Sequence, residues 1–235
     1  MKLKKKIKYL DPYTYMDLFL EKVFGKPKKT EIKIIYWIVY LLYSLLLAFI
    51  IYKGLGLILG TPLPLATVVS GSMEPSFYRG DIIIVSSAKN ISSEIITIDE
   101  NIRNKNITDF LEIKSQKNEY GKEEAKYIII NEKEIDISNA IENKNSIVIY
   151  KSNITGKDII HRIVLTIEAN DGIFVLTKGD NKETNYVIDQ ECVISGNYVL
   201  NGCLHVYSIP KEDLLGKKIG KIPYIGYLKL FLFKG

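Results

Sequence analysis

The sequence predicts a mainly β protein that is tied to a membrane by one N-terminal helix. The helix is indicated by Ile34–Tyr52, nineteen residues without a charge, since a membrane-spanning helix needs about 20 apolar residues. The β fold is indicated by short apolar segments, such as Asp81–Ser86 and Ile160–Ile167, that turn residues separate. The 235 residues, 47% of them apolar, are enough for this anchor and one domain with a sizeable core.

The first 33 residues carry all of the excess positive charge. The whole chain has a net charge of +5, and residues 1–33 contain ten lysines and only four acidic side chains. The remainder therefore lacks the basic surface that nucleic acid needs, and no nucleic-acid partner is expected. Within this cytoplasmic basic segment, Asp11 and Pro12 suit the start of a helix. The following Tyr13–Phe24 is either a short helix on the membrane surface or a poorly ordered tail.

Residues 34–59 are predicted to be a retained transmembrane signal anchor. The run is too long for the apolar core of a removable signal peptide, and Gly60-Thr61-Pro62 is a poor cleavage site. Because lysine-rich flanks stay in the cytoplasm, we expect a single-pass protein of the cell membrane with residues 60–235 outside. Twelve residues separate Leu59 from Ser72, a tether of at most about 45 Å, so Ser72 should lie near the outer membrane surface.

Residues 60–235 are predicted to form the extracytoplasmic β domain. Ile160–Ile167 and Ile173–Thr177 flank Asn170-Asp171-Gly172, which is a strong hairpin signal. The continuous apolar run Ile82–Val85 predicts a strand that is buried on both faces. A short helix is expected only near Lys211–Leu215 in this half of the chain.

An inserted segment is expected at about residues 87–157. It contains two predicted strands, Tyr127–Ile130 and Ser146–Tyr150, and a polar, weakly patterned stretch, Asp99–Lys126, that is expected to be partly mobile. No catalytic constellation is visible in it. At the other end of the domain, Ile222–Phe233 is apolar and aromatic but too short to span a bilayer. It is either a closing strand with an apolar tail or a segment that dips into the membrane interface.

The cysteines and histidines exclude a metal centre. Two of each are too few, and too poorly spaced, for a zinc site, and neither a metal nor a cofactor is expected. Cys192 and Cys203 form a disulfide if the domain lies outside the cell, or else remain two buried thiols.

The chemistry is expected at Ser70-Gly71-Ser72-Met73-Glu74-Pro75, which follows the strand-like pair Val68-Val69. Pro75 prevents continuation of a strand or helix, and the small residues before it leave a hydroxyl accessible. The segment is either a plain turn or the site of a serine nucleophile. A serine needs a base to accept its proton, and the chain offers only His161 and His205. His205, in Leu204-His205-Val206-Tyr207, is expected to be an ordinary strand residue.

Three segments in order resemble the sequence boxes of the type I signal peptidases. They are Ser70–Pro75, His161-Arg162-Ile163, and Leu176–Asn181, which contains Lys178-Gly179-Asp180-Asn181. The archaeal and endoplasmic-reticulum branch of that family has His in the second box, where most bacterial enzymes have Lys. The resemblance covers roughly Leu65–Pro223, apart from the segment between the first two boxes, and it implies a signal-peptidase-like β-sheet catalytic domain.

The resemblance implies that Ser72 is the nucleophile and His161 the general base. An imidazole with an ordinary pKa of about 6.5 can take up and release a proton near neutral pH. The oxyanion hole would be the Ser70 hydroxyl and the Ser72 backbone N–H. Met73 would be a wall of the substrate groove. Lys178 is a rival base by its place next to the third box, but the family's lysine aligns with His161.

The carboxylate that orients His161 is left open between two residues. Asp180 belongs to the third box. In relatives of this branch a second Asp usually follows six residues later, but Tyr186 occupies that position here and the next carboxylate is Asp189. Either a loop three residues longer brings Asp189 to the site, or Asp180 itself orients the base. Arg162 either pairs with an acidic residue or faces solvent, and it is assigned no role.

The predicted function is that of a membrane-bound serine endopeptidase that cleaves N-terminal signal peptides from exported proteins. Its expected partners are signal-peptide-bearing preproteins with small residues at the first and third positions before the cut, the lipid bilayer, and the secretion translocon. Two alternatives remain open: a related peptidase with a narrow client set, and an inactive membrane-anchored β module that binds partner proteins.

Overall fold

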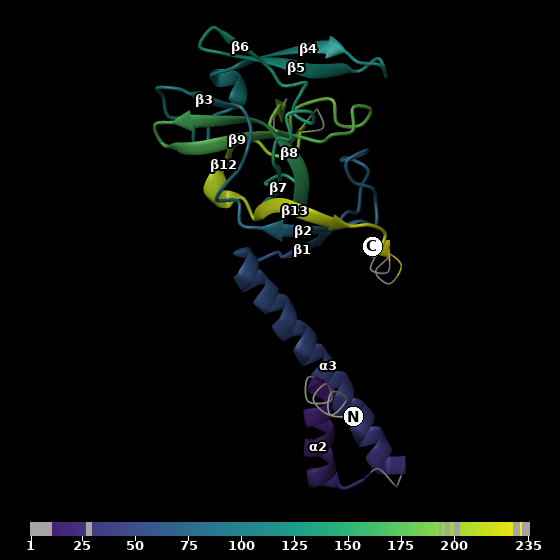
Figure 1. Ribbon diagram of the computed structural model, residues 1–235. Coiled ribbons are helices and arrows are strands. Elements are labelled where there is room, and N and C mark those ends of the chain that lie inside the picture. The colour runs from purple at the N-terminus through teal and green to yellow at the C-terminus, as the bar shows by residue number, and fades with distance from the viewer. Residues whose placement is uncertain are drawn as a thin grey trace. The chain divides into compact units, whose positions relative to one another are not determined.

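The computed structural model describes residues 11–26, 30–192, 194–195, 198–199, 203–227 and 231 of the chain. It divides into two compact units, Met1–Leu55 and Gly56–Gly235. The helices α2 and α3 lie in or begin in the first unit, and the strands all belong to the second (Figure 1).

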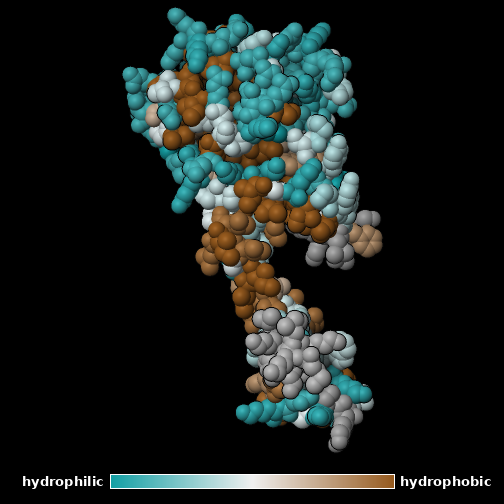
Figure 2. Space-filling view, viewed as in Figure 1, coloured by the Kyte–Doolittle hydropathy of each residue, from teal (hydrophilic) through white to brown (hydrophobic). Residues whose placement is uncertain are grey.

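Helix α2 begins where Asp11 and Pro12 predict a helix start, whereas α3 begins four residues before the predicted span of residues 34–59. Helix α2 spans Pro12–Phe24, and the Asp11 carboxylate caps it by accepting a hydrogen bond from the Tyr13 N–H at 3.0 Å. Helix α3 spans Thr30–Leu59 and is, among the described residues, the one helix long and apolar enough to cross a membrane. Figure 2 shows brown, apolar side chains along the visible part of this helix. Trp37 near its start is 76% exposed. An unburied apolar helix of this length suits an anchor rather than a core element.

The larger unit is built on one eight-stranded sheet with the strand order β1-β2-β13-β7-β8-β9-β12, to which β3 adds by pairing with β8. Its members are β1 (Leu65–Thr67), β2 (Ile82–Ser86), β3 (Ile95–Thr97), β7 (Ile147–Lys151), β8 (Asp158–Ala169), β9 (Gly172–Lys178), β12 (Ile209–Pro210) and β13 (Gly216–Ile222). All of the pairings are antiparallel except that of β3 with β8.

A second, three-stranded sheet consists of β4 (Glu112–Lys117), β5 (Glu123–Ile130) and β6 (Lys133–Asp136). A third element is the small hairpin of β10 (Ile194–Ser195) and β11 (Tyr198–Val199). Two 3-10 turns, η1 (Ile107–Asp109) and η2 (Lys211–Asp213), complete the unit. The second of these lies where a short helix is predicted.

The β8–β9 hairpin forms as its turn residues predict. Asn170 and Asp171 make the turn, and Gly172 adopts a φ of +145° that favours glycine. The Asp171 carboxylate accepts hydrogen bonds from the backbone N–H groups of Ile102 and Arg103, so the turn also holds the preceding loop. The backbone N–H groups of that loop lower the pKa of Asp171 below its ordinary value, against the opposing effect of its own desolvation.

The strands within residues 87–157 contribute to both sheets. β3 and β7 are part of the large sheet, and β4–β6 make the small one. The stretch Asp99–Lys126, whose weak pattern predicts a partly mobile segment, contains β4, η1 and the fully buried Ile102 and Ile107. One apolar core fills the space between the sheets, with Ile128 and Ile135 from the small sheet packed among residues of β8 and β9.

The expectation for β2 was wrong in one respect. Ile83 and Val85 are fully buried, but Ile82 and Ile84 are only partly buried. The strand therefore covers core with one face only. Ile82 and Ile84, on the second face, belong to none of the buried apolar clusters of the described residues, so that face is only partly covered.

Candidate active site

The turn that carries Ser72 connects β1 to β2. The chain stays extended for one residue beyond β1. The Val68 N–H donates to the Asp81 carbonyl oxygen, and the Val68 carbonyl oxygen accepts from the Gly80 N–H. The Glu74 N–H then closes a turn onto the Gly71 carbonyl at 3.1 Å, and the Glu74–Pro75 peptide is cis. The hydroxyl oxygens of Ser70 and Ser72 lie 3.2 Å apart, within hydrogen-bonding distance.

The third sequence box holds this turn in place. The Asn181 backbone N–H and side-chain amide donate to the carbonyl oxygens of Ser72 and Gly71, each at 3.0 Å. Gly179 permits this approach, because a Cβ at that position would lie 2.6 Å from the Ser72 carbonyl oxygen. The first and third boxes, far apart in sequence, are therefore one structural unit.

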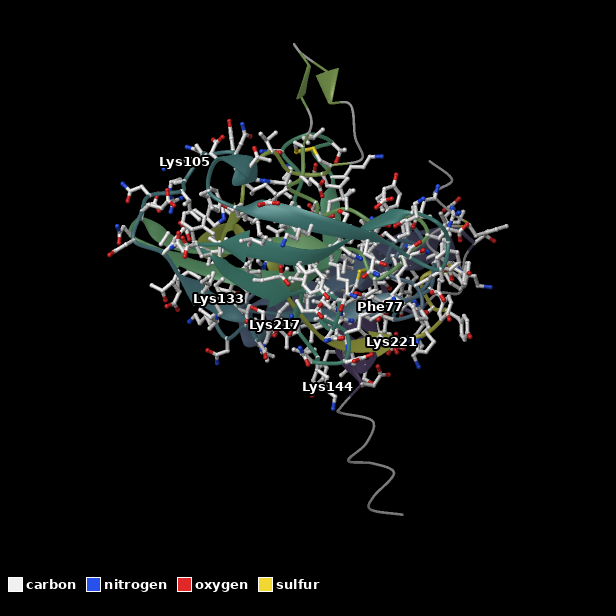
Figure 3. All side chains as sticks on the ribbon, turned by 90° about the horizontal axis from the view of Figure 1, so that it is seen from above. Phe77, Lys105, Lys133, Lys144, Lys217 and Lys221 are labelled. Carbon is white, nitrogen blue, oxygen red and sulfur yellow. A yellow bond between two sulfur atoms is a disulfide. The ribbon has the colours of Figure 1, made fainter. Side chains whose placement is uncertain are left out.

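Strand β13 also contacts the end of this turn. The Lys221 ammonium donates to the Ser76 carbonyl oxygen at 3.1 Å and lies 5.8 Å from the centre of the buried Phe77 ring (Figure 3). A cation at this distance from an aromatic face is attracted to it. Neither Asn181 nor Lys221 was singled out from the sequence, although Asn181 lies within the third box.

His161 and Arg162 are neighbours in β8 and therefore point to opposite faces of the sheet. The His161 Nδ1 lies 2.6 Å from Oδ2 of Asp189, and both side chains are almost fully buried. Asp189 follows Asp180 by nine residues instead of the usual six, and it still contacts the histidine. The structure brings His161 and Asp189 together.

Asp180 is engaged on the other face of the sheet. It forms a two-point ion pair with Arg162, whose Nε and Nη2 lie 2.8 and 2.7 Å from its carboxylate oxygens. The Ser76 hydroxyl also donates to Asp180, and Arg162 Nη1 donates to the Asn145 carbonyl oxygen. Asp180 therefore contacts Arg162 and the end of the serine turn, not the histidine.

Lys178 also lies on the Arg162 face, because the two residues are direct partners in the β8–β9 register. Its ammonium pairs with Glu124 of β5 at 2.9 Å. Lys178 thus joins β9 to the three-stranded sheet, and it does not line the cavity that contains Ser72.

A cavity of about 350 Å³ brings the predicted site residues to one surface. Ser70, Ser72, Met73 and His161 all line it. Its other walls are mostly apolar and come from the β1 extension, the start of β8 and two loops: Thr67, Val68, Val69, Phe77, Lys157, Asp158, Ile159, Ile160, Asn185 and Leu204. A larger cavity of about 450 Å³, near Lys89 and Lys211, is lined by none of the predicted catalytic residues.

The segment that follows Asp189 is closed by a disulfide between Cys192 and Cys203. Directly after it, the backbone N–H groups of Leu204 and His205 donate to the Asp189 carbonyl oxygen at 2.8 and 3.0 Å. His205 is therefore a loop residue, and its prediction as a strand residue was wrong. Its backbone N–H donates to the Asp189 carbonyl oxygen and therefore does not pair with a neighbouring strand.

The electrostatics of the buried groups favour neutral neighbours around Asp189. Burial lowers the pKa of His205 below its ordinary value. Burial, and then the nearby charge of Asp189, raise the pKa of Tyr150 well above its ordinary value of 10.0. Among the described residues no group of three or more His, Cys, Asp or Glu side chains is placed to hold a metal ion.

Comparison with known proteins identifies the family. No family model matches the chain. It is 29% identical to the signal peptidase complex catalytic subunit SEC11 of Chaetomium globosum and 30% identical to that of Sclerotinia sclerotiorum, and 27% identical to the subunit of Metarhizium robertsii. Each match covers 79% of this chain and 73% of the relative. The resemblance found in the three sequence boxes is thus confirmed, and the chain belongs to the family of the signal peptidase complex catalytic subunits.

Proposed function

We propose that this chain is a membrane-bound serine endopeptidase that cleaves N-terminal signal peptides from exported proteins. The observation that carries the proposal is the shared cavity of Ser72 and His161, with Asp189 hydrogen-bonded to the histidine. Relatives named as signal peptidase catalytic subunits supply the substrate class.

In the proposed mechanism, the Ser72 hydroxyl attacks the scissile carbonyl carbon while His161 Nε2 takes its proton. The negative charge that develops on the carbonyl oxygen is stabilised by the Ser70 hydroxyl and the Ser72 backbone N–H. The imidazolium then gives its proton to the leaving amine, and water hydrolyses the acyl-enzyme by the same route. Asp189 stabilises the imidazolium throughout, because its carboxylate contacts Nδ1.

The cavity also supports the expected substrate preference. The side chains before the cut would lie against Met73, Ile160 and the neighbouring apolar walls. Met73 is 1% exposed and has little freedom to move away. We therefore expect small residues at the first and third positions before the cut and poor cleavage of bulky ones.

The membrane arrangement is part of the proposal. The lysine-rich flank would keep the N-terminus in the cytoplasm, so that α3 crosses the cell membrane once and residues 60–235 lie outside, where preproteins leave the translocon. The end of the catalytic unit supports contact with lipid, because Tyr224 is 71% and Ile225 57% exposed. The Gly226 N–H donates to the Gly80 carbonyl oxygen, which fixes this apolar segment beside the turn that leads into β2.

The test is a cleavage assay with the detergent-solubilised full chain and a preprotein, followed by sequencing of the product N-terminus. Ser72→Ala and His161→Ala should each abolish processing, because the members of such a unit lose nearly all activity singly. Ser115→Ala, at an exposed position of β4, is the matched control and should cleave normally. Near-normal cleavage by purified His161→Ala would refute the mechanism, and an inactive wild type would favour the binding module.

A further inference from the structure

Three donors converge on one oxygen atom of Asp189. Its Oδ2 lies 2.6 Å from His161 Nδ1, 2.9 Å from the Tyr150 hydroxyl and 2.7 Å from the Thr177 hydroxyl. Tyr150 and Thr177 are fully buried, and neither was recognised from the sequence.

Three adjacent strands of the large sheet supply these side chains: β7, β8 and β9 (Figure 1). Val148 is the direct partner of His161, so Tyr150, two residues further along β7, is on the same face as the histidine. Thr177 is the partner of Ile163, two residues beyond His161, and shares that face as well. The Asp189 backbone N–H donates to the Thr177 carbonyl oxygen at 2.9 Å, which fixes the carboxylate above the three strands.

The direction of the Thr177 hydrogen bond follows from Gln190. Its Oε1 accepts the Thr177 backbone N–H at 3.0 Å, and a backbone N–H can only donate. The other amide atom is therefore the nitrogen, which donates to the Thr177 hydroxyl oxygen at 3.2 Å. The hydroxyl's own hydrogen is thus directed to Asp189.

The Tyr150 hydroxyl is also a donor. Burial and the charge of Asp189 raise its pKa well above 10.0, so that it keeps its proton at any working pH. A protonated phenol beside a carboxylate oxygen donates to it. Asp189 Oδ2 therefore shares its negative charge among two hydroxyls and His161.

We propose that Tyr150 and Thr177 are positioning residues. They fix the Asp189 carboxylate against His161. Because they share its negative charge, they also limit how tightly the imidazole holds the proton that it takes from Ser72. The catalytic part of this inference rests on the proposed function. A base that must later give its proton to the leaving amine works best when the proton is not held too tightly. Other titratable groups near the cluster are His205, whose ring packs edge-on against Tyr150 at 5.9 Å, and Lys157 and Asp158, which line the cavity.

The test compares Tyr150→Phe, Thr177→Val and the double variant in the full chain. Each change removes one hydrogen-bond donor from Asp189. The negative charge of Asp189 is then shared with fewer donors and stabilises the imidazolium of His161 more strongly. The acid limb of the pH–rate profile should move to higher pH by roughly half a unit per lost donor. A hydrogen bond to a charged group has about the free energy of one pKa unit or more, and only part of it is transmitted to the imidazolium. We expect kcat to fall about fivefold with KM unchanged, because the cavity walls are not altered.

A second measurement reads His161 without substrate. The chain has only two histidines, so ¹⁵N-histidine labelling gives two imidazoles, and His205→Gln assigns them. The NMR titration of His161 should move upward in the same variants. Thr177→Ser keeps the hydroxyl and should restore the wild-type titration, and Tyr120→Phe, at an exposed position, is the matched control.

Two results would overturn the proposal. One is a His161 titration that is unchanged in Tyr150→Phe and Thr177→Val while only the melting temperature falls, as mere packing residues would give. The other is an equal shift in Thr177→Ser and Thr177→Val. If the titration moves as expected but the wild type cleaves no preprotein, the proposed function fails and the positioning of His161 by these residues stands.

Discussion

His161 and Arg162 show how one step along a strand separates two carboxylates that the sequence does not distinguish. The alternation of side chains in β8 places the histidine with Asp189 on one face and the arginine with Asp180 on the other. The loop between the two aspartates is three residues longer than the usual family spacing, so no spacing rule identified the partner of His161. The register of β8 against β7 and β9 does.

The two aspartates should therefore fail in different ways when each is replaced by Asn. Asp189→Asn removes the charge that offsets the buried imidazolium, and an unpaired buried charge costs about 3–5 kcal/mol. We expect kcat to fall roughly a hundredfold to a thousandfold. Its melting temperature should change little, because the amide oxygen can still accept from Tyr150 and Thr177.

Asp180→Asn is the matched comparison. It leaves the Arg162 guanidinium buried without a countercharge, so the free energy of unfolding should fall by about 3–5 kcal/mol. The folded fraction should retain most of its activity. A fully active, normally stable Asp189→Asn would remove Asp189 from the site, and activity and thermal melting of both variants decide between the two assignments.

At the scale of elements, Lys178 links β9 to β5 through its ion pair with Glu124, and this structural role explains it without a role as base. Lys178→Met breaks its mostly buried pair with Glu124 and should lower the free energy of unfolding by about 2 kcal/mol. Turnover per folded molecule should stay within a few-fold of the wild type. In both proteins the rate should fall on the acid side of neutral pH, as expected for a histidine base. A loss of cleavage in this variant, or a wild-type acid limb above about pH 8, would restore Lys178 as the base.

The disulfide ties the loop that ends at Leu204 to Asp189. It joins two cysteines with a sequence separation of 11, which corresponds to about 3 kcal/mol of stabilisation in the chain-entropy model. Cys192→Ser/Cys203→Ser should lower the free energy of unfolding by about that amount. It should also lower kcat, because the N–H groups that hold the Asp189 carbonyl directly follow Cys203.

Reductant supplies the control for the disulfide. It should lower the melting temperature of the wild type to that of the double variant and leave the double variant unchanged. Equal melting of oxidised and reduced wild type would contradict the prediction.

The elements that the sequence predicts well are those with a strong local signal. Helix α3 follows from an uninterrupted apolar run, and the β8–β9 hairpin from its Asn170-Asp171-Gly172 turn. Other features depend on contacts between distant segments. The parallel pairing of β3 with β8 and the convergence of Tyr150 and Thr177 on Asp189 have no local signal, because they arise from the order of strands in the sheet. For the same reason the strands of residues 87–157 could be recognised singly, but not their division between two sheets.

For the whole molecule, the proposed membrane orientation rests on the distribution of charge along the chain. Nine of the ten lysines of residues 1–33 precede α3, whereas Gly56–Gly235 carries the cavity and a nearly balanced set of charges. Lysines within about 15–20 residues of a first span tend to keep that flank in the cytoplasm. The catalytic unit should then reach the opposite side.

Three glycosylation sequons, at Asn90, Asn106 and Asn153, make this orientation measurable. All three asparagines are exposed in the catalytic unit. When the chain is translated in the presence of microsomes, these sites should receive glycans, because glycosylation occurs only on the lumenal side, which is equivalent to the outside. A variant with Gln at all three positions should show no shift in gel mobility. Replacing Lys26, Lys28, Lys29 and Lys33 by Glu should reduce the glycosylated fraction, since it removes the lysines nearest the span. Unmodified wild-type chains whose catalytic unit is digested by added protease would show that it faces the cytoplasm, and the proposed orientation would be wrong.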